Sequence, residues 1–169
     1  MTVTGTAATG AGNIAPGRIL RLVIGQMSLT AGVFWLVMAL TVPYPRDFFV
    51  GGALAAGGLA LLLWRRLRPP VRFVSVTAAM TAIGGTAAGL AVHTTSMGGM
   101  FGWFESRGWP FAWAGLGGLA DTTEEAHRQA VADGWGLDWF RLLVDVTLWA
   151  YAGLVVAVVI GLAWRALRK

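Results

Sequence analysis

The sequence predicts an all-α integral membrane protein: a four-helix bundle with both termini inside and a long outward aromatic loop that contains a short helix. Three observations lead to this fold class. The chain has 169 residues, of which 56% are hydrophobic and only 12% charged, and this composition is too apolar for an ordinary soluble domain. Four long apolar stretches interrupt the chain. These stretches also separate all eight acidic residues from nine of the thirteen basic residues.

Each apolar stretch is long enough to be considered as a membrane-crossing helix. Residues 22–42 would form a helix about 31 Å long, which is sufficient for a hydrocarbon core. Paired prolines precede the second and third stretches and end the helices before them. The predicted spans are residues 22–42, 48–64, 73–92 and 142–164. They leave a tail of residues 1–21, an outward loop of residues 93–141 and a tail of residues 165–169.

The charge pattern predicts the orientation. Nine basic residues and no acid lie in the N-terminal tail, in the segment from Arg65 to Arg72 and at the C-terminus. Because short loops rich in Lys and Arg stay in the cytoplasm, we expect both termini to be cytoplasmic. One Lys against twelve Arg, with abundant Ala and Gly, indicates a GC-rich bacterial genome and hence a bacterial plasma membrane. The basic residues lie at the ends of apolar stretches, which favours lipid headgroups over nucleic acid as partners.

Small residues at helical spacing predict the helix contacts. In lipid, helices associate by close approach, so small residues on one face indicate where a neighbour packs. The third span has such a face in Ala82, Gly85 and Gly89, and the first has Gly25 and Gly32. The neighbour is either another helix of this multi-pass chain, or a different subunit or second copy.

The outward loop contains five of the nine Trp, which favours a folded or docked segment over a disordered one. Residues 98–119 are apolar and aromatic but broken by Gly and Pro, so we expect them at the outer interface or as a cap over the bundle. Thr122 and Glu125 form a capping box, and Gly134 predicts the end of a helix that runs from Thr123 to about Ala132. Asp138 is the expected N-cap of the final helix.

Asp145 is the one acid expected just inside a span. An ionisable residue at membrane depth is a functional candidate. Arg141 precedes it by four residues on the same helical face. We therefore expect either an ion pair between Arg141 and Asp145 or hydrogen bonds from Asp145 to the outward cap, with a proton or substrate site as the alternative.

His93, Met97 and Met100 form a candidate metal site at the start of the outward loop. Imidazole and thioether groups are ligands that a soft ion such as Cu(I) accepts. Met is also an ordinary interfacial residue, and no other cofactor is predicted. The chain has no Cys and no recognisable catalytic or phosphate-binding motif, so an enzyme is not the favoured reading.

Two segments, RGWPFAW at residues 107–113 and WFRLLVDVTLW at residues 139–149, carry a resemblance. They resemble an uncharacterised family of small multi-span bacterial and archaeal membrane proteins. In that family an outward Gly-aromatic-Pro element precedes a final span that contains an Asp and then a Trp. The matching residues here are Gly108, Trp109, Pro110, Asp145 and Trp149. The resemblance implies a structural coupling between Asp145 and the turn from Gly108 to Phe111, and it supplies no activity.

These observations favour a non-enzymatic accessory or assembly subunit of a larger membrane complex. It would contact its partner through the small-residue helix faces and the aromatic outward loop. One alternative is a small-ligand or copper protein that uses His93, Met97 and Met100. Another is an enzyme or transporter that acts on a lipid or quinone through Asp145.

Overall fold

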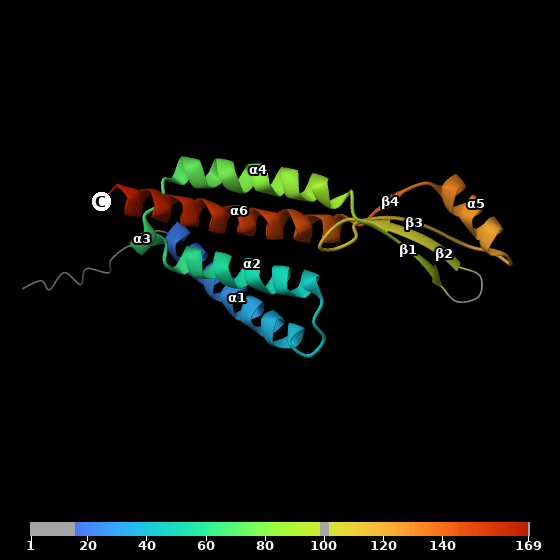
Figure 1. The fold of residues 1–169 in the computed structure, drawn as a ribbon, viewed down its shortest axis with the longest axis horizontal. Coiled ribbons are helices and arrows are strands. Elements are labelled where there is room, and N and C mark those ends of the chain that lie inside the picture. The colour runs from blue at the N-terminus through green and yellow to red at the C-terminus, as the bar shows by residue number, and fades with distance from the viewer. Residues whose placement is uncertain (1–15, 99–101, 169) are drawn as a thin grey trace, which may run out of the picture.

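The computed structural model describes residues 16–98 and 102–168. Within these residues the chain forms six helices and a four-stranded sheet. The helices are α1 Pro16–Ala39, α2 Pro45–Leu62, α3 Trp64–Leu67, α4 Val71–Gly89, α5 Thr123–Asp133 and α6 Trp139–Leu167. The strands are β1 His93–Gly98, β2 Gly102–Arg107, β3 Ala114–Leu119 and β4 Gly136–Leu137. Figure 1 shows an elongated molecule with the long helices at one end and the sheet with α5 at the other.

Three helices are long and apolar enough to cross a membrane: Gly17–Ala39 in α1, Val71–Gly89 in α4 and Trp139–Leu167 in α6. The predicted second span, residues 48–64, is not among these candidates. Helix α2 begins at Pro45 and ends at Leu62, so its 18 residues include the charged Arg46 and Asp47. The apolar part of α2 is therefore shorter than the sequence pattern indicated.

The prediction of an all-α four-helix bundle is wrong. The predicted outward loop, residues 93–141, contains an antiparallel sheet with strand order β1-β2-β3-β4 as well as the expected short helix. The long helices also do not form a four-helix bundle: one buried cluster, with Ala60, Val74 and Leu154, joins α2, α4 and α6, and among the described residues it contains none from α1. They form a row in which α1 packs on α2, α2 on α6, and α6 on α4, as Figure 1 shows.

Glycines bring α1 and α2 together. A Cβ atom on Gly25 would lie 3.1 Å from the carbonyl oxygen of Gly58. A Cβ atom on Gly32 would overlap the backbone of Ala55 and lie 2.8 Å from the carbonyl oxygen of Gly51. The two backbones approach this closely only because side chains are absent at the contact, which is the expected packing mode for helices in lipid.

Small and large residues alternate across the other helix contacts. The ring of Trp149 on α6 occupies the space where Gly85 of α4 has no side chain, and the ring of Tyr151 fills the corresponding space at Gly57 of α2. Tyr151 Oη also lies 2.7 Å from Ser28 Oγ of α1, so a hydrogen bond joins α6 to the first helix. Helix α6 therefore contacts α4 through one side and α2 through another.

The short helix α3 follows α2 and leads into the turn before α4. Its C-cap, Arg68, has a left-handed φ of 42°, and Pro69 and Pro70 follow before α4 begins. The guanidinium of Arg165, near the end of α6, donates to the carbonyl oxygens of Leu67 and Arg68 at 2.5 and 2.7 Å. This side chain satisfies carbonyl groups that the end of α3 leaves free.

Helix α5 covers one face of the sheet. Ala114, Leu116 and Gly118 alternate as the buried positions of β3, and Gly118 lies directly against the backbone of Ala126 on α5. Ala126 and Ala130 are fully buried between the helix and the sheet. We call β1, β2, β3, α5 and β4 together the sheet module.

Two capping predictions are confirmed. Thr122 Oγ1 accepts a hydrogen bond from the backbone N–H of Glu125 at 3.3 Å, and the N–H of Gly134 closes the far end of α5 on the carbonyl oxygen of Ala130. Asp138 Oδ1 accepts from the N–H of Arg141 at 3.0 Å and so caps α6. Helix ends of this kind are encoded locally, which is why the sequence located them.

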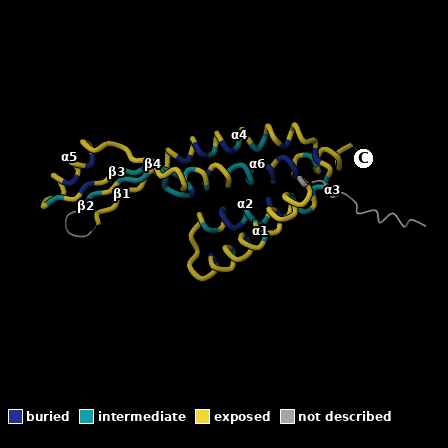
Figure 2. Tube along the Cα trace, turned by 180° about the vertical axis from the view of Figure 1, so that it is seen from behind, coloured by how far each residue is buried: buried dark blue, intermediate teal, exposed yellow. Residues whose placement is uncertain are grey.

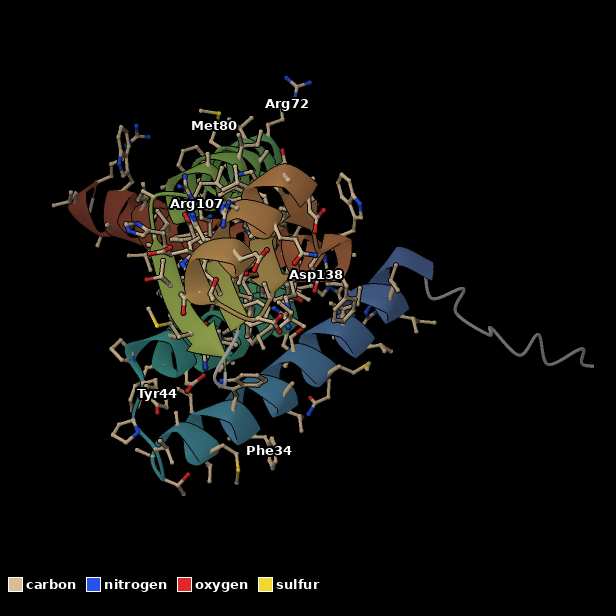
Figure 3. All side chains as sticks on the ribbon, turned by 90° about the vertical axis from the view of Figure 1, so that its right-hand side faces the viewer. Phe34, Tyr44, Arg72, Met80, Arg107 and Asp138 are labelled. Carbon is tan, nitrogen blue, oxygen red and sulfur yellow. The ribbon has the colours of Figure 1, made fainter. Side chains whose placement is uncertain are left out.

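The outer surfaces of the long helices are apolar and exposed. Most of α1 and much of α4 are exposed in Figure 2. Phe34 of α1 and Met80 of α4 are 63% and 68% exposed, and Figure 3 shows them pointing away from the molecule on opposite sides. Large exposed apolar surfaces on long helices are what a hydrocarbon environment would cover.

We expect Gly32→Ala to weaken the contact between α1 and α2. The added methyl group overlaps the backbone of Ala55, which cannot move as a side chain can, so the cost should be about 1–3 kcal/mol. Gly52→Ala is the matched control, because its Cβ would meet nothing within 4 Å. Thermal unfolding in a mild detergent, followed by tryptophan fluorescence, measures the difference. Equal stability of the two variants would contradict this contact.

Candidate functional site

The candidate site is the joint between the sheet module and the long helices. Its centre is the loop of residues 108–113, which connects β2 to β3 and which we call the joint loop. The chain also passes this level where α4 leads into β1 and where β4 leads into α6, as Figure 1 shows. The joint loop therefore lies among the ends of several helices.

Asp145 binds the joint loop through a hydrogen bond. Its Oδ1 accepts from the backbone N–H of Phe111 at 3.1 Å, and its side chain is fully buried at 0% exposure. Its Oδ2 has no hydrogen-bond partner among the described residues. A backbone N–H that is removed from water needs an acceptor, and this carboxylate supplies one from the second turn of α6.

Trp149, one turn further along α6, binds the same loop. Its indole Nε1–H donates to the carbonyl oxygen of Trp109 at 3.3 Å. The Phe49 ring of α2 completes an aromatic cluster, with its centroid 4.5 Å from that of Trp109 and 4.9 Å from that of Trp149. Asp145 and Trp149 therefore hold two successive parts of the joint loop. Phe49 packs against the rings of Trp109 and Trp149.

Further hydrogen bonds fix the edges of the joint loop. Arg141 Nη1 donates to the carbonyl oxygen of Ala112 at 3.2 Å. The backbone N–H of Asp138 donates to the carbonyl oxygen of Trp113 at 2.7 Å. On the other side, the N–H of Gly108 donates to the carbonyl oxygen of Val92 at 3.2 Å. The loop is thus bonded both to the start of α6 and to the segment that follows α4.

Two glycines are required for this arrangement. Gly108 has a φ of 129°, a conformation that residues with a side chain rarely adopt, and its Cβ would lie 2.5 Å from the carbonyl oxygen of Phe111. Gly89, at the end of α4, has its Cβ position 2.9 Å from the carbonyl oxygen of Trp109. Any larger residue at these two positions would push the joint loop away from α4 or open its turn.

The structure brings together most of the residues that the sequence singled out here. Trp109, Asp145 and Trp149 are in direct contact with one another or with the joint loop, and Pro110 is buried within the loop, where its peptide bond with Trp109 is cis. Of the two arrangements expected for Asp145, the structure has the hydrogen bond to the outward segment. Arg141 forms its ion pair with Asp138, at 3.1 Å between Nε and Oδ2, instead of with Asp145.

The five small residues proposed for helix packing all lie in contacts inside the chain. Gly25 and Gly32 face α2, Gly85 faces Trp149, and Gly89 faces the joint loop. Ala82 is buried on the same side of α4. These faces are therefore occupied by the chain itself.

The candidate copper ligands do not converge within the described residues. His93 and Met97 are at opposite ends of β1, four residues or about 13 Å apart. Met100 lies outside the described residues. Met97 instead borders a hollow with Trp103 and His127, whose ring centroids are 4.4 Å apart. Copper binding by His93, Met97 and Met100 stays a prediction. In the described part of the chain, no three His, Asp or Glu side chains are grouped to hold a metal ion.

Sequence reasoning missed three residues of the joint, one of which is Trp35 of α1, with its ring 6.3 Å from that of Phe111. Trp35 and Phe49 lie within the predicted first and second spans, and Arg46 lies in the short segment between these spans. Arg46 lies with its guanidinium 5.9 Å from the Phe111 ring. Arg46 and Phe49 come from the first turns of α2, and Trp35 comes from α1. All three precede the loop that they contact by more than fifty positions, and no local pattern links the segments.

The geometry of the joint is that of a structural connection. Asp145 is closed off from solvent, and its bonded partner is a main-chain group. What this arrangement can do is fix the direction of the sheet module relative to α4 and α6. The chain matches none of the family models, curated proteins or solved structures with which it was compared.

We expect Asp145→Ala to loosen the joint. Removing the carboxylate leaves the Phe111 N–H without its acceptor in a buried place, at a cost of about 1–3 kcal/mol. Asp145→Asn should retain most of the stability, because an amide oxygen can accept the same bond. Val146→Ala, on the exposed side of α6, serves as the control. Thermal unfolding and limited proteolysis of the sheet module would report the change, and an unaffected Asp145→Ala variant would contradict it.

Proposed function

We propose that this protein is a non-enzymatic accessory or assembly subunit of a larger complex in a bacterial plasma membrane. In this proposal α1, α4 and α6 cross the bilayer, and α2, packed along α1, returns the chain through the same layer. Both termini are then cytoplasmic, and the sheet module faces outward. The module then serves as the surface that another membrane subunit recognises. The joint fixes the position of this surface relative to the spans.

The distribution of charge along the molecule supports the proposed orientation. The basic residues at the start of α1, between α2 and α4, and at the end of α6 lie at one end of the molecule, and the sheet module lies at the other (Figure 1). Glu105, Asp121, Glu124, Glu125 and Asp133 all belong to the module or its loops. An end with many arginines and no acid is typical of a cytoplasmic face.

The observation that carries the proposed partner role is the free edge of the sheet. All six residues of β1 are exposed, and within the described residues this strand pairs only with β2. An edge strand presents unpaired N–H and C=O groups, which a strand from another protein can complete. Because the joint holds the module in place, this edge is presented in a fixed direction beside the membrane.

The contacts between the long helices also favour the sheet module as the partner surface. The small-residue faces that were expected to meet a partner are occupied by α2, by Trp149 and by the joint loop. The partner surface is therefore placed on the sheet module in this proposal, rather than on these glycine faces.

The orientation can be tested with single cysteines, because the natural chain has none. We expect Thr95→Cys on β1 to react with a membrane-impermeant maleimide in intact cells. Arg66→Cys on α3 should react only after the membrane is permeabilised. Labelling of Arg66→Cys in intact cells, with Thr95→Cys protected, would reverse the proposed orientation.

The partner role can be tested by a photoreactive amino acid at position 95 on β1. We expect it to give a covalent adduct with one specific membrane protein in native membranes. The matched position is Asp133, which is exposed at the end of α5 away from the free edge and should give no such adduct. A protein that is monomeric in mild detergent and forms no adduct from position 95 would contradict the role.

A further inference from the structure

A hollow of about 670 Å³ opens beside the joint, between α2, the joint loop and the start of α6. We call it the headgroup hollow. Its walls include Arg46 from the first turn of α2 and Phe111 from the joint loop. At the beginning of α6, the wall is formed by Asp138, Phe140, Arg141 and Val144. The hollow lies at the level where the candidate span of α6 begins.

Two guanidinium groups border the headgroup hollow, and their neighbours hold both in position. Arg141 donates to the carbonyl oxygen of Ala112 and pairs with Asp138. Arg46 lies against the Phe111 ring, with its Nε 3.5 Å from Asp47 Oδ1. The two side chains remain 49% and 58% exposed, so each has N–H donors available for a ligand.

A phosphate group is the ligand that two such guanidiniums recognise best, because its oxygens can accept several charge-assisted hydrogen bonds. The other two arginines of the sheet module and its surroundings are elsewhere. Arg107 is paired with Glu105 and stacked on Trp135, and Arg128 belongs to α5. Of these four arginines, only Arg46 and Arg141 border the hollow, and each is also paired with a carboxylate.

Asp138 adds a negative charge to the same hollow. Its side chain is partly exposed, and as a carboxylate it can accept hydrogen bonds from an ammonium group. A ligand with a phosphate and a primary ammonium a few ångströms apart would match both charges. Phosphoethanolamine has this arrangement, whereas choline has no N–H to donate and glycerol has no positive charge.

An apolar wall continues from the hollow along α6. Phe140 is 75% exposed and lies in the wall with Val144, and Leu143 next to them is also exposed. In a bilayer this surface would meet acyl chains directly below the headgroups. We propose that the headgroup hollow binds phosphatidylethanolamine of the outer leaflet, with the phosphate between Arg46 and Arg141 and the ammonium group at Asp138. This inference rests on the proposed membrane insertion and not on the proposed partner.

The test uses the full-length protein in nanodiscs that contain equal amounts of phosphatidylethanolamine, phosphatidylglycerol and phosphatidylcholine. After transfer to mild detergent, native mass spectrometry counts the lipids that remain bound. We expect the natural chain to retain phosphatidylethanolamine preferentially. Arg46→Gln should lower this retention about tenfold, since one charge-assisted hydrogen bond contributes on this order. Arg128→Gln, which removes the same charge from α5, should leave the retention unchanged.

A second variant separates the ammonium from the phosphate contact. Asp138→Asn keeps an oxygen for the N-cap of α6 and removes only the charge, so the fold should persist. We expect it to abolish the preference for phosphatidylethanolamine over phosphatidylglycerol while both lipids still bind. An unchanged preference in this variant would overturn the assignment of Asp138.

Three other outcomes would overturn the lipid site. One is equal retention of all lipids by the natural chain, and another is equal loss in Arg46→Gln and Arg128→Gln. The third is displacement of the bound lipid by millimolar free phosphoethanolamine, which would indicate a soluble ligand. In each case a protein that still inserts into the nanodisc leaves the proposed membrane location standing, so the two proposals fail separately.

Discussion

The hydrogen bond between Asp145 and the joint loop is the interaction on which the rest of the structure depends. A loop can enter the space between helix ends only if its main-chain groups find partners there, because water does not supply them. The carboxylate of Asp145 accepts from Phe111, and Trp149 donates to Trp109, so an acceptor and a donor from one helix satisfy a donor and an acceptor of the loop. With the loop fixed, the positions of β2 and β3 are fixed as well.

Glycine allows the same close approach elsewhere in the molecule. In the contacts of α1 with α2 and of α4 with α6, a glycine on one helix faces either a backbone or a large ring on the other. The glycines at these contacts are therefore packing positions and not breaks between helices. Where apolar burial gives no advantage over contact with lipid, this complementary fit of small against large is what draws helices together.

Local signals were read correctly from the sequence, and contacts over a long separation were not. Thr122 and Asp138 mark helix starts by side chains that accept backbone N–H groups, and Gly134 marks the end of α5 by its positive φ and its own N–H; all three act as expected. The sheet was missed because its buried positions on β3 are Ala114, Leu116 and Gly118, which give too weak an alternation of apolar and polar residues to indicate a strand. The strand β1 has no buried residue at all.

Of the candidate site, too, only the residues with a local signal could be predicted from the sequence. Asp145 was noticed because a charge near a span is rare, and the aromatic loop because tryptophan is concentrated there. The contact between Phe49 and Trp109 joins segments that are sixty residues apart, so only the fold could reveal it. The bounds of α2 differ from the predicted span of residues 48–64, because Pro45 begins the helix and its charged first turn was expected in the segment before the span.

The row of helices has a mechanical consequence. The sheet module is joined to α4 through β1 and to α6 through β4, and the joint loop is bonded to α6 and to the segment after α4. Helix α1 contacts mainly α2 and lies at the far side of the row. A sideways force on the sheet module is therefore transmitted first to α4 and α6 together. It reaches α1 through α2, whose Phe49 and Arg46 lie at the joint, and through Trp35, whose ring lies 6.3 Å from that of Phe111. A tilt of the module would therefore shift the two helix pairs relative to each other.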